Sequence, residues 1–225
     1  MLRNEFLIKF ADKSWEPFED VYKLHLDKLI QIALNSGEPI EGSTFFWNHA
    51  TDFKNFVPEF KNKRRVLSLT AVASSCILEV GFNARFSALL MLVSNEKLRL
   101  TSVDIAYHNY TIPCAEYLKS IFGDRFELIK GNSLNVLPSH LTSFNDYDII
   151  IIDGGHGIDL AESDLLNACS YSNSKTRILF DDSDHAQLRP LLDLYIIKGI
   201  ISPISDSQGY LHNTNQMLFK INKNP

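Results

Sequence analysis

Residues 76–90, CILEVGFNARFSALL, contain the strongest indication of the fold. An apolar run ends at Val80 and a second apolar run begins a few residues later, which indicates a buried strand that leads through a turn into a helix. Glycine-rich turns at this place bind phosphates through bare backbone amides. This turn has one glycine, Gly81, and it has Asn83 and Arg85 where a glycine-rich turn would have two more. The sequence therefore disfavours a pyrophosphate ligand.

Short apolar runs alternate with helical segments along the rest of the chain. We expect strands at 76–81, 98–105, 126–131, 147–155 and 176–182, and helices at 17–36, 61–73, 84–94, 112–122, 158–171 and 186–198. The pieces IISPISDS and QMLFKIN predict a terminal hairpin at the sheet edge. This alternation predicts an α/β fold with a doubly wound, mostly parallel, seven-stranded sheet and an antiparallel terminal strand. We expect an N-terminal helical cap at 1–63 and the main domain at 64–225.

Composition and charge exclude several classes of function. The chain has 22 basic and 27 acidic residues, a net charge of −5 and no dense basic stripe, so we expect no nucleic-acid partner. The basic run KNKRR at 61–65 is interpreted as a solvated helix end. Cys76, Cys114 and Cys169 show no CxxC spacing, which favours the reducing cytoplasm. Since no uncharged apolar run approaches the length of a membrane span, we expect a soluble, cytoplasmic protein without a membrane partner.

Polar side chains follow each predicted parallel strand at its carboxyl end, where ligands bind in open α/β sheets. They are Glu79 and Gly81, then Asp104, then Gly131, Asn132 and Ser133, then Asp153, Gly154, Gly155 and His156, and finally Asp181 and Asp182. Carboxylates with few bare amides suit a ligand that contains a ribose, an adenine and a cationic centre. S-adenosylmethionine is such a ligand.

Five segments together resemble those of a known family. ILEVGFNARFSALLML, TSVDIAYHNYTIPCAEYL, LIKGNS, YDIIIIDGGH and ILFDD resemble segments of the class I S-adenosylmethionine-dependent methyltransferases. More narrowly, they resemble the metal-dependent O-methyltransferases related to catechol O-methyltransferase and the group whose fourth strand ends in IDGGH. The resemblance implies a Rossmann-like fold and methyl transfer to a hydroxyl of a small molecule.

The same resemblance implies a cofactor site. Residues 79–83 would wrap the methionine end of the cofactor, Asp104 would accept hydrogen bonds from both ribose hydroxyls, and Asn132 with Ser133 would lie beside the adenine. The full expected set is Glu79, Gly81, Phe82, Asn83, Ser87, Asp104, Asn132, Ser133 and Asp153. Arg85 departs from the pattern, because relatives often have glycine there. Either its side chain points away from the cofactor or cofactor binding is weakened.

A second group of residues predicts a metal-assisted reaction. Asp153, Asp181 and Asp182 come at the ends of neighbouring strands, and such close carboxylates raise each other's pKa unless a cation joins them. Oxygen ligands suit Mg²⁺, and Mn²⁺ would fit if His156 or His185 joined. The resemblance implies a divalent metal on the three aspartates. It also places the general base at His156, so that His156 and Asp153 are the expected catalytic residues.

Each of these residues also has an ordinary structural interpretation. Asp181 and Asp182 could cap the helix expected near residue 186, and His156 could bond to the loop backbone. The cluster Phe45, Phe46 and Trp47 is either core or a lid, and Tyr107, His108 and Tyr110 are candidates to flank the cofactor.

Two other functions stay open. A nicotinamide-dependent oxidoreductase is disfavoured by the missing glycines, and a catalytically inactive cofactor-binding or partner-binding protein is kept open by Arg85. The sequence does not choose among sugar, polyketide and phenolic acceptors, and it leaves open whether the chain forms a homo-oligomer.

Overall fold

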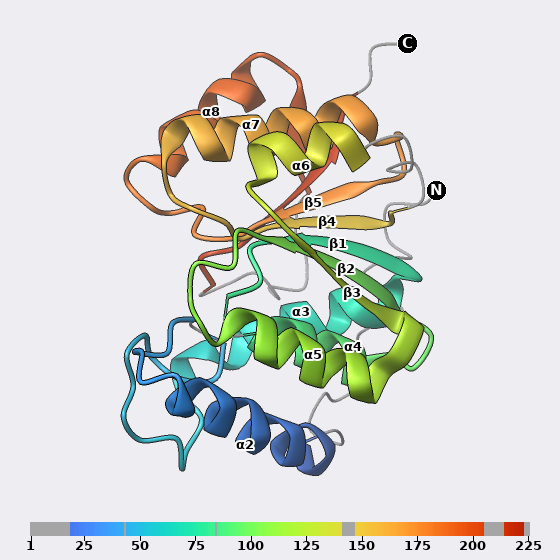
Figure 1. Cartoon of the computed structure of the whole chain (residues 1–225). Helices are drawn as coiled ribbons and strands as arrows, with labels where there is room; N and C mark the ends of the chain where they lie inside the picture. The colour runs from blue at the N-terminus through green and yellow to red at the C-terminus, as the bar shows by residue number, and fades with distance from the viewer. Residues whose placement is uncertain (1–18, 43, 84, 141–146, 205–213, 223–225) are drawn as a thin grey trace.

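A seven-stranded sheet forms the centre of the molecule (Figure 1). The computed structural model describes residues 19–42, 44–83, 85–140, 147–204 and 214–222 of the 225-residue chain. The strands are β1 (Cys76–Val80), β2 (Arg99–Asp104), β3 (Phe126–Lys130), β4 (Ile149–Ile152), β5 (Arg177–Phe180), β6 (Ile201–Pro203) and β7 (Met217–Ile221). Their order is β3-β2-β1-β4-β5-β7-β6, and β7 runs antiparallel to both of its neighbours. The predicted sheet with an antiparallel terminal strand is confirmed.

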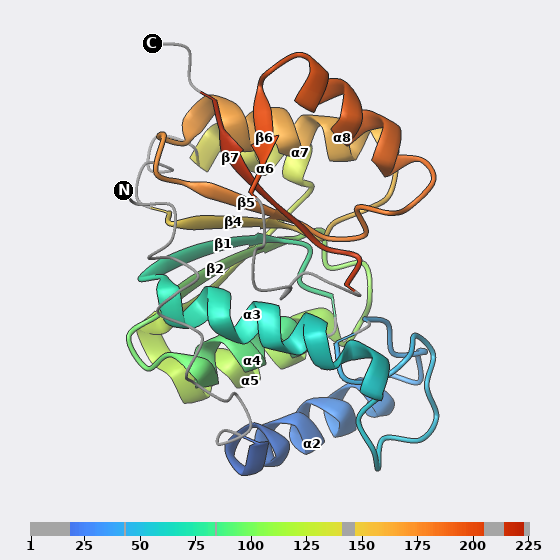
Figure 2. The ribbon, with the colours of Figure 1, turned by 180° about the vertical axis from the view of Figure 1, so that it is seen from behind.

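Helices cover both faces of the sheet (Figures 1 and 2). One layer contains α3 (Lys61–Ala73), α4 (Phe86–Ser94) and α5 (Thr111–Phe122), and the other contains α6 (Ser133–His140), α7 (Ile158–Tyr171) and α8 (Leu188–Ile197). The short helical turns η2 (Pro58–Phe60) and η3 (Gly123–Arg125) precede α3 and β3. Helix α6 was not expected from the sequence. Among the described residues, no helix combines the length and the apolar character that crossing a membrane requires.

The sequence of β4 explains why this strand is central. Its four isoleucines are all buried, because successive side chains point to opposite faces and both faces are covered by helices. Ile149 and Ile151 belong to the core on the α3–α5 side, whereas Ile150 and Ile152 belong to the core on the α6–α8 side. The uninterrupted apolar run therefore fixes β4 in the middle of the molecule.

The N-terminal segment is built into the same core as the sheet. Helix α2 (Glu19–Asn35) packs outside the first helix layer, against α4 and α5. Phe45 and Phe46 are buried, which agrees with a core position, whereas Trp47 is 56% exposed. The expected boundary between residues 63 and 64 falls inside α3, a helix of the layer on the sheet.

The interpretation of KNKRR as a solvated helix end is wrong for two of its residues. Lys63 and Arg64 are only 6% and 3% exposed. Arg64 Nη1 donates hydrogen bonds of 3.0 Å to the carbonyl oxygens of Thr44 and Val57, so it ties the segment that precedes α3 to that helix. Lys63 faces the carboxyl ends of the strands, where its partners are acidic.

Candidate functional site

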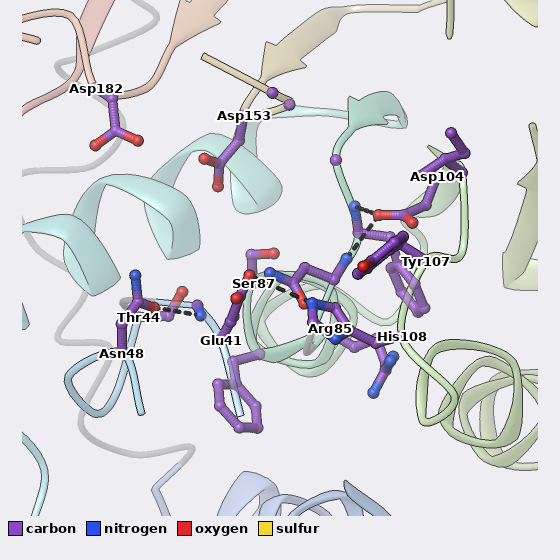
Figure 3. A pocket seen from close by; sticks show the side chains of 18 of the residues that line it. Glu41, Thr44, Asn48, Arg85, Ser87, Asp104, Tyr107, His108, Asp153 and Asp182 are labelled. Carbon is purple, nitrogen blue, oxygen red and sulfur yellow. Dashed lines mark hydrogen bonds and ion pairs between the residues drawn. The ribbon is translucent and has the colours of Figure 1, made fainter. Parts of the chain in front are cut away.

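A pocket of about 540 Å³ opens at the carboxyl ends of β1, β2 and β4, and its volume lies in the range of small-molecule sites (Figure 3). Its walls come from the turn after β1, from the residues after β2 and β4, and from Glu41, Gly42, Thr44 and Asn48. Of the expected site residues, the structure brings Gly81, Phe82, Asn83, Ser87, Asp104, Asp153, His156 and Asp182 to this pocket. Sequence reasoning missed Glu41, Thr44, Asn48 and Lys63, which also line it.

The turn after β1 depends on its one glycine. Gly81 has φ +94°, in the region that favours glycine, and a Cβ at this position would lie 1.9 Å from the carbonyl oxygen of Asp153. The turn therefore lies directly against the backbone at the end of β4. A side chain at residue 81 would force these two loops apart.

The backbone amides of this turn bind the side chain of Asp104. Its Oδ2 accepts hydrogen bonds from the backbone N–H groups of Phe82, at 2.7 Å, and Asn83, at 2.8 Å, and its Oδ1 accepts one from Ala106 at 2.6 Å (Figure 3). The two bare amides thus bind a carboxylate of the chain itself. This arrangement answers the question raised by the single glycine, because the amides that would hold a phosphate are already used.

Glu79 lies beneath the pocket and is fully buried. Its carboxylate accepts hydrogen bonds from the hydroxyls of Ser87, at 2.5 Å, and Ser102, at 2.6 Å. Burial raises the pKa of Glu79 to about 7, against the effect of the two serine hydrogen bonds, and the nearby charge of Asp104 raises it further. Glu79 does not line the pocket itself, but its hydrogen-bond partner Ser87 does.

The two residues expected beside the adenine begin helix α6. Asn132 Oδ1 accepts a hydrogen bond of 3.0 Å from the N–H of Leu134, as a residue before a helix often does, and Ser133 is buried. Neither residue belongs to the pocket lining. Their contact with an adenine stays a prediction.

Arg85 packs between two aromatic rings. It is 1% exposed, and its guanidinium carbon lies 5.2 Å from the ring centre of Phe82 and 4.9 Å from that of Tyr110. Burial lowers the pKa of Arg85 to about 10, although the charge of Asp104 opposes this change. The side chain lies on the same side of the pocket as His108, away from Asp153 and Asp182 (Figure 3). Arg85 belongs to the pocket lining, so its packing between the two rings does not decide between the two alternatives for this residue.

Tyr110 joins the turn to the N-terminal segment. Its buried hydroxyl donates to Asn83 Oδ1 at 3.0 Å and accepts a hydrogen bond of 3.2 Å from the N–H of Glu41. Next to it, His108 lies 3.0 Å from a carboxylate oxygen of Glu38 and 3.3 Å from one of Glu41. Tyr107 is 85% exposed at the rim of the pocket. These contacts position residues 38–41 as one wall of the site.

The three expected aspartates lie together at the ends of β4 and β5, and two of them, Asp181 and Asp182, have partners outside the cluster. Asp181 Oδ2 is 2.5 Å from Lys63 Nζ, and Asp181 Oδ1 accepts a hydrogen bond from the N–H of Asp182. Asp182 Oδ2 is 2.7 Å from His156 Nε2, and Asp182 Oδ1 accepts a hydrogen bond from the side-chain amide of Asn215. The helix-capping alternative is not supported, because α8 begins at Leu188 without a side-chain cap.

The electrostatics of this cluster are dominated by one buried cation. Burial and the adjacent Asp181 carboxylate raise the pKa of Asp153, and Lys63 opposes this change. Burial alone would lower the pKa of Lys63, but the carboxylates of Asp181 and Asp153 raise it above its ordinary value. Lys63 is therefore a charged ammonium inside the acidic cluster.

The residues present do not fit the divalent metal that was expected here. All four carboxylate oxygens of Asp181 and Asp182 already have partners within the chain. In the part of the chain that the structure describes, no group of three or more His, Cys, Asp or Glu side chains is arranged to hold a metal ion. The ring centre of His185, the other candidate ligand, lies 5.0 Å from the ring centre of His156.

Comparison with known proteins places this geometry in context. Residues 78–183, which run from β1 to just beyond β5, match a family model described as a methyltransferase domain. No curated protein matches the chain in sequence.

Solved structures share the fold at low sequence identity. Cofactor-bound Rv0187 from MTB is 16% identical, with a TM-score of 0.62 over 88% of this chain and 90% of that one. The O-methyltransferase TomG from Streptomyces achromogenes, involved in tomaymycin synthesis and solved with SAM, is 16% identical with a TM-score of 0.60 over 88% and 89%. An O-methyltransferase from Bacillus cereus in complex with SAH is 16% identical with a TM-score of 0.57 over 88% and 90%.

Proposed function

We propose that the chain, whose residues 78–183 match a methyltransferase-domain model, transfers the methyl group of S-adenosylmethionine to a hydroxyl oxygen of a small molecule. One observation carries the proposal. A single pocket contains the carboxylate of Asp104 on one wall and the pair of His156 and Asp182 on another. The Asp104 carboxylate suits the hydroxyls of a ribose, and the pair of His156 and Asp182 suits the removal of a proton from the acceptor.

The cofactor half of the proposal rests on the turn after β1. Asp104 is fixed by three backbone N–H groups, and its carboxylate oxygens keep further lone pairs that can accept from ribose hydroxyls. We place the methionine end of the cofactor against Gly81, where the chain has no side chain, and beside Asn83 and Ser87. The cofactors of the B. cereus and S. achromogenes proteins, SAH and SAM, support this assignment.

The acceptor half of the proposal rests on His156. Its Nε2 lies 2.7 Å from Asp182 Oδ2, so in the tautomer that donates from Nε2 the other ring nitrogen, Nδ1, can accept a proton. The imidazole removes the hydroxyl proton while the oxygen attacks the methyl carbon. The C–O bond forms, the C–S bond breaks, and the sulfonium becomes a neutral thioether. Asp182 orients the ring and stabilises its positive charge, and Asp153 lies beside them where cofactor and acceptor meet.

Metal assistance is not part of this proposal. The aspartates that were expected to hold Mg²⁺ or Mn²⁺ do not fit a divalent ion as they are arranged, because Lys63, His156 and Asn215 occupy their oxygens. No step of the reaction is therefore assigned to a metal.

A methyl-transfer screen tests the proposal. The protein would be incubated with S-adenosylmethionine labelled in its methyl group and with pools of sugars, phenols and polyketides, and products would be identified by mass spectrometry. We expect an O-methylated product, and we expect His156→Ala to lower its rate by about 10²- to 10⁴-fold while S-adenosylhomocysteine still binds. His25→Ala, in helix α2, is the matched control.

Two results would contradict the proposal. Binding of NAD in place of S-adenosylhomocysteine would favour an oxidoreductase. Tight binding of S-adenosylhomocysteine without any methylated product would favour a catalytically inactive binding protein.

A further inference from the structure

Lys63 is a buried cation of the site, although it was expected to be a solvated residue of the KNKRR run. It lies near the start of α3, it is 6% exposed, and it lines the pocket. A lysine loses its hydration when it is buried, and such burial is unfavourable unless carboxylates compensate for the lost water. The position of Lys63 is therefore a consequence of the acidic cluster that it faces.

The contacts of the cluster show how the charges are matched. Lys63 Nζ is 2.5 Å from Asp181 Oδ2, and its charge also acts on Asp153 and Asp182. His156 pairs with Asp182 at 2.7 Å. Asp181 and Asp182 thus have charged or hydrogen-bonding partners from the chain, and the charge of Lys63 also acts on Asp153.

An ammonium group can supply the positive charge that a metal ion would supply in such a site. It is a compact point charge with three N–H donors, of which the contact with Asp181 uses one, and Lys63 reaches the pocket wall. Its remaining donors suit the acceptor oxygen, which becomes negative as it loses its proton. A divalent ion could enter only if Lys63 left, because both would compete for Asp181 Oδ2.

We propose that the ammonium group of Lys63 replaces the divalent metal in this active site, neutralising the three aspartates and stabilising the acceptor oxygen, so that methyl transfer needs no metal ion. This inference rests on the proposed methyltransferase function. It identifies Lys63 as a catalytic residue, and it predicts that removing this lysine creates a metal site from the same aspartates.

Binding of Mn²⁺ alone, followed by the electron paramagnetic resonance signal of the free ion, tests the inference without an acceptor. An ammonium a few ångströms from a carboxylate changes the proton affinity of that carboxylate by about 10- to 1000-fold, and its effect on a metal ion has the same origin. We therefore expect wild type to leave Mn²⁺ free, and Lys63→Met to bind one Mn²⁺ at least about tenfold more tightly. Lys63→Arg, which keeps the charge, and Lys61→Met, which removes an exposed lysine of the same helix, should behave as wild type does.

The outcomes separate this inference from the proposed function. Stoichiometric Mn²⁺ binding by wild type that disappears in Asp153→Asn would overturn the inference, and so would a folded Lys63→Met that leaves Mn²⁺ free. If Lys63→Met does not fold, the wild-type titration decides alone. Binding of S-adenosylhomocysteine, measured on the same samples, tests the proposed function independently. Where the acceptor screen yields a product, its rate should be unchanged by EDTA, and a rate that requires added Mg²⁺ would refute the inference.

Discussion

Replacing Glu79 with glutamine should remove the loss of stability that ionisation of this buried carboxyl causes as the pH rises. Glu79 is fully buried, and its pKa is raised from 4.5 to about 7. The unfolded chain ionises this group near pH 4.5, whereas the folded chain still holds its proton there. Between these two values the unfolded state binds fewer protons than the folded state, so stability falls as the pH rises. Below pH 4.5 both states are protonated, and the loss is absent.

The size of the effect follows from the shift in pKa. One pKa unit corresponds to about 1.36 kcal/mol, so a shift from 4.5 to about 7 corresponds to roughly 3 kcal/mol once the pH exceeds 7. Glutamine has the shape of the protonated acid and cannot ionise. Near pH 4.5, Glu79→Gln should therefore match wild type in its free energy of unfolding, and at pH 8 it should be the more stable protein by roughly 3 kcal/mol.

Urea unfolding between pH 4.5 and 8, followed by far-ultraviolet circular dichroism, measures this difference. Glu127→Gln is the matched control, because Glu127 is an exposed glutamate on the nearby strand β3. Its unfolding curve should follow that of wild type across the pH range. If Glu79→Gln and wild type lose stability in parallel as the pH rises, the reasoning about the buried carboxyl is refuted.

Two further substitutions test how the turn after β1 is held. Gly81→Ala should lower the free energy of unfolding by about 3 kcal/mol or more, because its Cβ would lie 1.9 Å from a backbone oxygen. Gly199→Ala, at φ +70° with open space around it, should lower this free energy by only about 1 kcal/mol. Equal losses of the two variants in urea unfolding would contradict this reasoning. Tyr110→Phe removes the hydroxyl that contacts Asn83 and Glu41, so titration calorimetry should show S-adenosylhomocysteine binding about 5- to 10-fold more weakly. Tyr107→Phe, at the exposed rim, should leave that affinity unchanged.

Much of the fold was predictable because its signals are local. The run Ile149–Ile152 has no polar residue, which is typical of a strand covered on both faces. The gathering of Asp153, Asp181 and Asp182 was also predictable, since neighbouring parallel strands end at the same edge of a sheet. Helix α6 was missed because it is only eight residues long and contains Pro138.

The partners of the aspartates could not be predicted in the same way. Lys63 belongs to a run of charged residues that looks solvated, and its burial depends on the packing of α3 against the sheet. A signal was present in the spacing, because Lys63 stands one helical turn before Leu67, which is buried. Asn215 comes from the far end of the chain, and no local pattern links it to Asp182.

Titration calorimetry of S-adenosylhomocysteine into wild type and Asp104→Asn tests whether this pocket binds the cofactor. If this pocket is the cofactor site, wild type binds one equivalent. The substitution then weakens binding by about tenfold or more, because hydrogen bonds to a charged acceptor are worth about 1.5–3 kcal/mol. Failure of wild type to bind, or equal affinity of the two proteins, would contradict the assignment.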